Sequence, residues 1–114
     1  MRNADLSGAY LRDAQLLSSD GKETISLEGA DLRGTDLREA VLRGADLRGA
    51  NLRGADLRGT DLREVDLGVS EETKKATDLT SANLTDADLR GARYDAETSW
   101  PHRFDLEASG AVAD

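Results

Sequence analysis

The chain of 114 residues contains no cysteine, one proline, one histidine and four aromatic residues. Without cysteine, neither disulfide bonds nor thiolate chemistry is open to it. Four aromatic side chains are few for an ordinary globular domain of this length, so a different kind of core is expected. No apolar stretch is long enough to cross a membrane and no secretory leader is visible. We therefore expect a single-domain cytoplasmic protein with no membrane partner.

What the sequence has instead is a five-residue repeat through the stretch 30–68. Leucine recurs at every fifth position, and the residue two places earlier is Ala, Thr or Val. The eight leucines are Leu32, Leu37, Leu42, Leu47, Leu52, Leu57, Leu62 and Leu67. A spacing of five fits neither the 3.6-residue period of a helix nor the strict alternation of a long strand. The density of Gly, Asp and Asn also disfavours a helix.

Each repeat predicts one short extended segment followed by a turn. In the extended segment, the leucine and the small residue two places earlier point to the same side, and the Asp or Asn between them points away. The remaining two residues, mostly Arg-Gly, must turn the chain, which glycine does easily. Glu39 and Glu64 take the same place, so the turn does not strictly require glycine. A chain that repeats this pattern with one side inward forms a solenoid.

The run ADLRG-TDLRE-AVLRG-ADLRG resembles the A(D/N)LXX pattern of the pentapeptide-repeat family. The resemblance covers roughly residues 4–96 and implies an all-β fold, a right-handed quadrilateral parallel β-helix with four repeats in each square coil. The C-terminal segment that contains Tyr94, Trp100 and Phe104 also resembles cyanobacterial members of this family.

Counting the inward positions predicts about four coils, provided that two insertions are read as loops. The first coil would hold Leu6, Leu11, Leu16 and Leu27, and the fourth would hold Leu79, Leu84, Leu89 and Tyr94. The insertions lie near 17–24 and 69–76, and the second can take a single helical turn. We divide the chain into a β-helix over residues 1–96 and a C-terminal cap and tail over 97–114. The cap can include one helical turn, from Asp105 to Ser109.

Both insertions flank the same side of the predicted shaft. The first leaves between the third and fourth sides of its coil, and the second leaves between the fourth and the first. Loops on repeat proteins often mark the binding side, so we expect a protein-contact face here. The candidate contact residues are Asp46, Arg48, Asp66, Val69, Lys74, Lys75, Lys22 and Glu23. The alternative reading, that the loops are merely tolerated insertions, stays open.

The charge pattern argues against nucleic-acid binding. The net charge is −8, yet the stretch 30–68 holds seven arginines against eight acidic residues, and the acidity gathers after it. Interleaved aspartates cancel the field of the arginine row, and no surface aromatics offer stacking. The aspartate row could suggest paired carboxylates or a cation site. A solvated surface of weak Asp–Arg ion pairs is the better explanation, because the aspartates recur on all sides, each near an arginine.

No constellation of residues supports an enzyme, a metal site or a cofactor site. His102 has no second histidine or cysteine to join it, so we expect a structural residue. No nucleophile–base pair, phosphate loop or dinucleotide fingerprint is present. Thr35, Thr60 and Thr77 replace alanine at the inward position, where we expect their hydroxyls to bond backbone carbonyls.

Two functions remain. The first is a non-enzymatic protein-interaction or scaffold module with an unknown protein partner. The alternative follows from the resemblance to quinolone-resistance members of the family: a DNA mimic that inhibits or protects a type II topoisomerase. The short, nearly neutral coils argue against this alternative. We expect a monomer, or a dimer formed through the uncapped N-terminal coil. A consensus-engineered sequence is a further option, although the irregular ends and loops favour a natural one.

Overall fold

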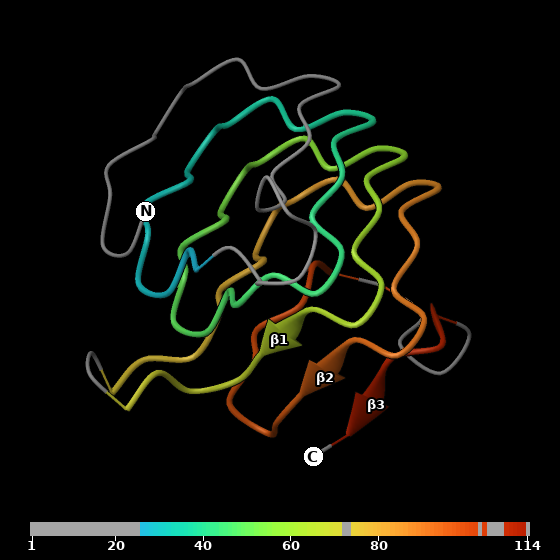
Figure 1. The fold of residues 1–114 in the computed structure, drawn as a ribbon. Coiled ribbons are helices and arrows are strands. Elements are labelled where there is room, and N and C mark those ends of the chain that lie inside the picture. The colour runs from blue at the N-terminus through green and yellow to red at the C-terminus, as the bar shows by residue number, and fades with distance from the viewer. Residues whose placement is uncertain (1–25, 72–73, 103, 105–108, 114) are drawn as a thin grey trace.

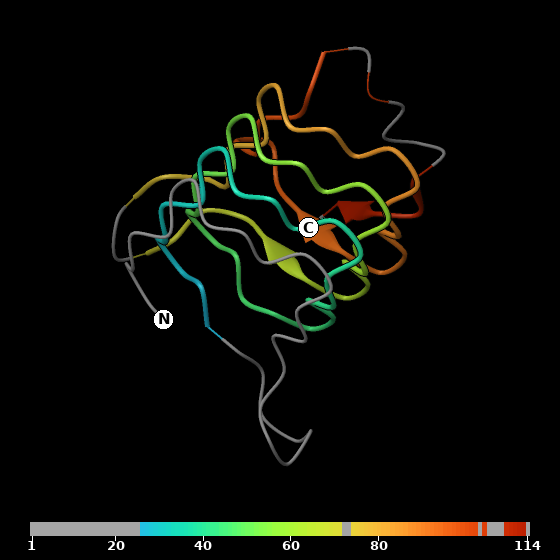
Figure 2. The same cartoon turned by 90° about the horizontal axis from the view of Figure 1, so that it is seen from above.

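The computed structural model describes residues 26–71, 74–102, 104 and 109–113, and in it the chain winds into a stack of square coils (Figure 1, Figure 2). Parallel β-bridges join equivalent positions of successive coils, as from Asp31 to Asn51 and from Asn51 to Asp78. The first step is 20 residues and the second is 27, so the insertion after Leu67 adds seven residues without disturbing the register. The quadrilateral β-helix predicted from the sequence is therefore confirmed.

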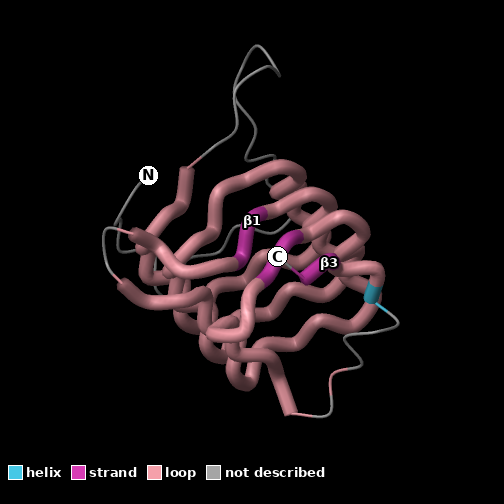
Figure 3. Tube along the Cα trace, turned by 90° about the horizontal axis from the view of Figure 1, so that it is seen from below, coloured by secondary structure: helices cyan, strands magenta, loops and turns pink. Residues whose placement is uncertain are grey.

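Three strands of two residues each lie on one side of the stack. They are β1 (Asp66–Leu67), β2 (Arg93–Tyr94) and β3 (Val112–Ala113), and they form a parallel sheet in the order β1-β2-β3. On the other sides the straight segments are so short that they pair through isolated bridges (Figure 3). Among the described residues, no helix has both the length and the apolar character that a bilayer span requires.

We number the four sides of the shaft by their inward residues. The first side carries Leu32, Leu52 and Leu79; the second carries Leu37, Leu57 and Leu84; the third carries Leu42, Leu62 and Leu89; the fourth carries Leu27, Leu47, Leu67 and Tyr94. All these leucines are buried, and alanines complete a column with no room for a lumen. The assignment of inward leucines is confirmed throughout the described part of the chain.

The turns share one backbone conformation whatever residue occupies them. Gly34 has a φ of 65°, and Glu39 at the next corner has a φ of 60°. The amide of Ala40 closes this turn on the carbonyl of Leu37 at 3.0 Å. Glu39 is the third of the four residues in this turn, the position at which a type II turn requires a positive φ. Glutamate is thus tolerated at the corner, as expected, but it adopts the left-handed conformation that glycine favours.

The three inward threonines satisfy the carbonyls of the shaft. Thr35 Oγ1 donates to the carbonyl of Leu32 in the repeat just before its own, and Thr60 Oγ1 donates to the carbonyl of Leu37 in the preceding coil. Thr77 Oγ1 donates to the carbonyl of Leu47 at 2.6 Å. Because each hydroxyl has an acceptor, its burial carries no unsatisfied polar group. The prediction for these three residues is confirmed.

The tail continues the winding beyond the four predicted coils. Ser99 pairs with Asp78 on the first side, and β3 pairs with β2 on the fourth. Thr98 Oγ1 donates to the carbonyl of Leu67, as Thr77 does one coil earlier. The ring of Trp100 lies edge-on to Tyr94, with centroids 5.5 Å apart. Phe104 stacks on Trp100 at 5.3 Å, so aromatic rings cover this end of the leucine column.

Several predictions of the sequence fall on other parts of the chain. The first predicted coil up to Leu16, the insertion at 17–24 and any dimer contact of that coil lie outside the described residues. The expected helical turn from Asp105 to Ser109 does so as well, except for Ser109, which has a 3-10 conformation.

Candidate functional site: a recess beside the second insertion

The structure divides the predicted contact residues into two groups. Asp46, Arg48 and Asp66 lie on the fourth side of the shaft, while Val69, Lys74 and Lys75 belong to the second insertion. That insertion leaves between the fourth and first sides, as the register predicts. Lys22 and Glu23 lie outside the described residues, so their place beside this face stays a prediction.

The fourth side is occupied by its own ion pairs. Arg48 donates from Nε and Nη2 to the two carboxylate oxygens of Asp46, at 2.9 and 2.8 Å. Its Nη2 also lies 3.6 Å from Glu28 Oε2, and its Nε lies 3.9 Å from Asp66 Oδ2. The hydrogen bonds to Asp46, with the charges of Glu28 and Asp66, raise the pKa of Arg48 above its ordinary value. Arg48 therefore serves the framework rather than standing open to a partner.

The second insertion is a hairpin with its base fixed to the shaft. Val69 and Ala76 form an antiparallel bridge, and the amide of Ser70 donates to the carbonyl of Lys75 at 2.9 Å. The amide of Lys74 in turn donates to the carbonyl of Ser70 at 2.8 Å, and Lys74 has a φ of 62°. The described ends of the insertion thus form a closed hairpin base, whereas the sequence allowed a helical turn.

Two side chains from other coils hold this base. Ser70 is fully buried and its Oγ donates at 2.8 Å to Oε2 of Glu28, which is only 5% exposed. On the opposite side, the amide of Val69 donates to Asp95 Oδ2 at 3.0 Å. Glu28 belongs to the coil two turns above and Asp95 to the coil below. The hairpin, named here by residues 69–71 and 74–76, is therefore tied to the shaft from both directions.

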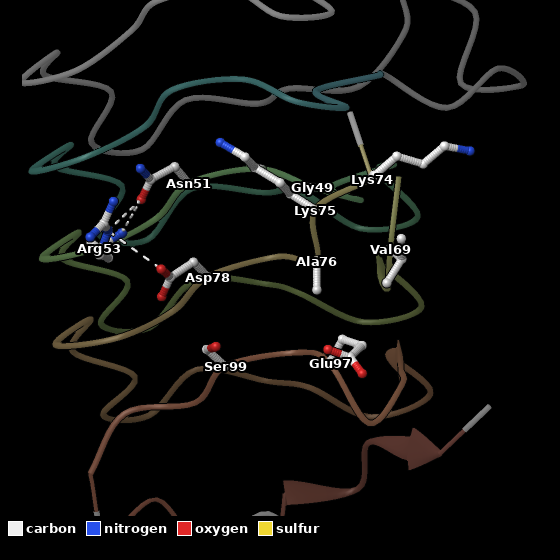
Figure 4. Close-up of a pocket in the computed structure, with 11 residues that line it drawn as sticks. Gly49, Asn51, Arg53, Val69, Lys74, Lys75, Ala76, Asp78, Glu97 and Ser99 are labelled. Carbon is white, nitrogen blue, oxygen red and sulfur yellow. Dashed lines mark hydrogen bonds and ion pairs between the residues drawn. The ribbon is translucent and has the colours of Figure 1, made fainter. Parts of the chain in front are cut away.

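A recess opens between the hairpin and the first side of the shaft (Figure 4). Its volume is about 620 Å³, which lies within the range of small-ligand and peptide-anchoring sites. Its lining residues are Gly49, Ala50, Asn51, Arg53, Val69, Lys74, Lys75, Ala76, Asp78, Glu97 and Ser99. A second recess of about 510 Å³ shares Gly49, Asn51 and Lys75 with it, so the two form one trough along the shaft.

The sequence prediction named only the hairpin side of this recess. Lys75 extends toward Asn51, whereas Lys74 points away from the shaft wall (Figure 4). The shaft side, with Asn51, Arg53 and Asp78, was not predicted as a contact surface. One signal was readable, because Asn51 replaces the aspartate that precedes most arginines of the run; Val41, before Arg43, is the other exception. Glu97 and Ser99 could not be placed without knowing that the tail begins a fifth coil.

Other aspartates that lie two residues before an arginine, such as Asp61 and Asp88, pair with that arginine. Asp88 accepts from both Nε and Nη2 of Arg90, and these hydrogen bonds hold the pKa of Asp88 down to about 2. The pKa of Asp61 is lowered in the same way by Arg63. Within the described residues, no group of three or more His, Asp or Glu side chains is arranged to hold a metal ion. His102 is exposed at the C-terminal end of the shaft, beside Pro101 and Phe104.

Square coils around a leucine column define a solenoid repeat protein. The family model described as pentapeptide repeats matches the chain in eight copies, over residues 1–38, 25–64 and 75–93. The chain belongs to the pentapeptide-repeat family.

The chain is similar to two solved structures of pentapeptide-repeat proteins. A pentapeptide-repeat protein of the Arabidopsis thaliana thylakoid lumen is similar with a TM-score of 0.71 and 30% identity, over 99% of this chain and 66% of that one, just under two thirds. A pentapeptide-repeat protein of Nostoc PCC 7120 is 32% identical, over 99% of this chain and 86% of that one, with a TM-score of 0.45. No curated protein sequence matches the chain.

A further similarity is to QnrB1, a plasmid-mediated fluoroquinolone resistance protein. It is 17% identical over 100% of this chain and 79% of that one, with a TM-score of 0.30. At this level the similarity carries no functional argument.

Proposed function

We propose that this chain is a non-enzymatic protein-interaction module, and that its partner docks in the recess beside the hairpin. The observation that carries the proposal is the double anchoring of the hairpin, through Ser70 to Glu28 and through Val69 to Asp95. A merely tolerated insertion needs no such ties, since a surface loop of this kind costs little when left loose. An anchored hairpin presents a surface of fixed shape, which lowers the entropy lost on binding.

The interior of the shaft supports the same conclusion. Leu32, Leu52 and their equivalents fill the column, so a ligand has no internal cavity to enter. Any interaction must use the outer sides, and on most of them the arginines are already engaged by aspartates. At the recess beside the hairpin, a concave surface and a break in this pairing occur together.

A deletion tests the proposal. Removing residues 69–75 joins Gly68 to Ala76 and restores the spacing of five between Leu67 and Leu79, so the shaft should still wind. We expect the variant to keep its circular dichroism spectrum and to lose the proteins that the full chain captures from an extract of its source organism. An Asp56→Asn variant, altered on the second side away from the hairpin, serves as the matched control. Equal capture by the deletion variant would reject the recess as the docking site.

The topoisomerase alternative has its own test. A DNA mimic needs a continuous negative surface, and in the described coils each row of aspartates alternates with arginines. No observation in this part of the chain favours that function. A gyrase supercoiling assay, run with and without a quinolone, decides the matter. We expect no change at micromolar protein.

A further inference from the structure

Arg53 departs from the pairing rule of the shaft. Arginines such as Arg33, Arg38 and Arg58 each donate from Nε and Nη2 to the aspartate two residues earlier. Arg53 follows Asn51 instead, and it donates only from Nε, at 3.3 Å to Asn51 Oδ1. The same Nε lies 3.4 Å from Asp78 Oδ2. Within the described part of the chain, the two terminal nitrogens of Arg53 have no hydrogen-bond acceptor, and its side chain is 55% exposed.

Asn51 adds a donor at the same place. Its Oδ1 accepts from the backbone amide of Arg53 at 3.2 Å and from Nε at 3.3 Å. Both partners are N–H groups, so the oxygen must face Arg53 and the Nδ2 amide must face outward. Figure 4 shows this orientation, with the nitrogen of Asn51 turned away from Arg53. An aspartate here would present an acceptor and a negative charge instead.

Lys75 completes the group from the hairpin side. It borders both recesses together with Asn51, and its side chain extends toward that residue (Figure 4). The closed hairpin base fixes the position of its backbone, because its carbonyl accepts from the amide of the anchored Ser70. A guanidinium, an amide and an ammonium therefore point toward one trough as donors, which is the chemistry of a site for an anionic group.

Two acidic residues on the same wall narrow the choice of anion. Asp78 lies against Nε of Arg53, and Glu97 borders the recess farther along the shaft. Their negative charges disfavour a doubly charged phosphate more than a singly charged carboxylate. The planar, two-oxygen carboxylate also matches the two terminal nitrogens of a guanidinium.

We propose that Arg53, Asn51 and Lys75 bind a carboxylate side chain of an acidic segment of a partner protein. This inference rests on the proposed function and names the chemistry of its partner. The hairpin supplies one wall and one cation. Asparagine at position 51, where most repeats have aspartate, supplies the rest, because it leaves the two terminal nitrogens of Arg53 without the carboxylate that binds them in other repeats.

The test is Asn51→Asp, which changes one amide to a carboxylate and restores the pair found elsewhere on the shaft. The probe is a fluorescent peptide rich in aspartate and glutamate, titrated by fluorescence anisotropy, beside the same peptide carrying asparagine and glutamine. We expect the acidic peptide alone to bind the wild type, and Asn51→Asp to weaken it roughly tenfold or more. The Asp56→Asn variant, which releases Arg58 where no lysine hairpin stands, should bind as the wild type does.

Three further measurements accompany this titration: thermal stability, spectra of arginine side chains, and displacement of the peptide by small anions. The thermal midpoint of Asn51→Asp should equal or exceed that of the wild type, because aspartate occupies this position in neighbouring repeats. In spectra of arginine side chains, the Nε–H signal of Arg53 should shift on adding the peptide. Acetate should displace the peptide, and inorganic phosphate should do so no better. Stronger displacement by phosphate, or unchanged affinity of Asn51→Asp, would overturn the carboxylate site.

The failure of this proposal can be told from failure of the proposed function. If deleting residues 69–75 abolishes partner capture while Asn51→Asp leaves it intact, the docking surface stands and the carboxylate site falls. If neither change affects capture, both fall.

Discussion

Two neighbouring sides of one coil carry nearly the same repeat and hold their arginines differently. On the second side, Asp56 accepts from Nε and Nη2 of Arg58 at 2.8 and 2.6 Å. On the first side, the guanidinium of Arg53 donates to Asn51 through Nε alone, at 3.3 Å. The change amounts to one oxygen replaced by nitrogen. It teaches that the aspartate of the repeat binds both Nε and a terminal nitrogen of the arginine, and that its replacement by asparagine leaves the terminal nitrogens without that acceptor.

The hairpin makes this difference relevant to binding. The second side has no insertion next to it, so the exposed head of Arg58 stands on an open wall. Beside Arg53, the hairpin adds a second wall and Lys75. The recess thus combines a regular shaft, one substitution in its pattern and one anchored insertion.

The largest effect should come from the leucine column that both sides share. Leu52 is fully buried behind Asn51 and Arg53. Leu52→Arg would place an unpaired charge in an apolar column, a cost of several kcal/mol that a small domain cannot absorb. We expect no folded protein by circular dichroism, whereas Leu52→Met, which nearly conserves volume, should cost less than about 1.5 kcal/mol. A soluble, cooperatively folded Leu52→Arg variant would contradict the inward assignment.

The next largest loss of stability should come from the base of the hairpin, at the corner between the fourth and first sides. Ser70→Ala removes the hydroxyl that donates to the buried carboxylate of Glu28. Losing a hydrogen bond to a buried charged group costs about 1–3 kcal/mol, measurable by urea unfolding. Amide hydrogen exchange should also quicken at Lys74 and Ser70, while the amides of the second side stay protected. Ser99→Ala, on an exposed residue, is the control, and equal effects of the two changes would argue against the anchor.

The sequence predicted the leucine column of the shaft far better than the anchoring of the hairpin. Leucine at every fifth position predicted an inward column, because a five-residue period leaves no other arrangement that buries all of these leucines. The contact between Ser70 and Glu28 spans 42 positions and depends on how the hairpin folds back, which no local pattern encodes. The fifth coil was missed because Trp100 stands in the place of leucine, although Thr98 repeats the role of Thr77.

A smaller effect should appear at the turns, where the two sides differ in residue but not in conformation. Gly34 on the first side has a φ of 65°, and no atom lies within 4 Å of the place that a Cβ would take, so Gly34→Ala tests conformation alone. The left-handed conformation costs a residue with a Cβ about 1–2 kcal/mol, partly offset by the entropy that glycine loses on folding. We expect a net loss of about 1 kcal/mol.

The reverse change, from a residue with a side chain to glycine, can be made at Glu39 on the second side. Glu39 already bears the left-handed conformation, with its carboxylate lying over Gly59. Glu39→Gly should therefore raise the free energy of unfolding by about 0.5 kcal/mol. If both substitutions destabilise equally, the corner is limited by packing rather than by backbone conformation. Chemical denaturation of the two variants beside the wild type provides the measurement.

The smallest effect should be a dependence of stability on pH, which the pair of Asp56 and Arg58 causes and the pair of Asn51 and Arg53 does not. The hydrogen bonds from Arg58, with its charge, lower the pKa of Asp56 below its ordinary value of 3.8. A carboxylate with a lowered pKa in the folded state stabilises fully above the pKa of the unfolded chain, and this contribution disappears as the pH falls through the folded value. Because Asn51 does not titrate, the pair of Asn51 and Arg53 lacks this dependence, although Asp31 on the same side of the shaft has a lowered pKa of its own.

A comparison of wild type with Asp56→Asn isolates that dependence. At pH 6 the variant should be less stable by about 0.5 kcal/mol, the usual size for an exposed pair. The difference should shrink below about pH 4 as Asp56 takes up a proton, and Asn51→Asp should gain the pH dependence that the variant loses. If the deficit of Asp56→Asn persisted undiminished in acid, its cause would be packing or hydrogen-bond geometry rather than the charge of the pair. The geometry of aspartate, and not its charge, would then hold Arg58 in place. The loss of hydrogen bonds to the terminal nitrogens of Arg53 beside Asn51 would need a steric explanation instead of an electrostatic one.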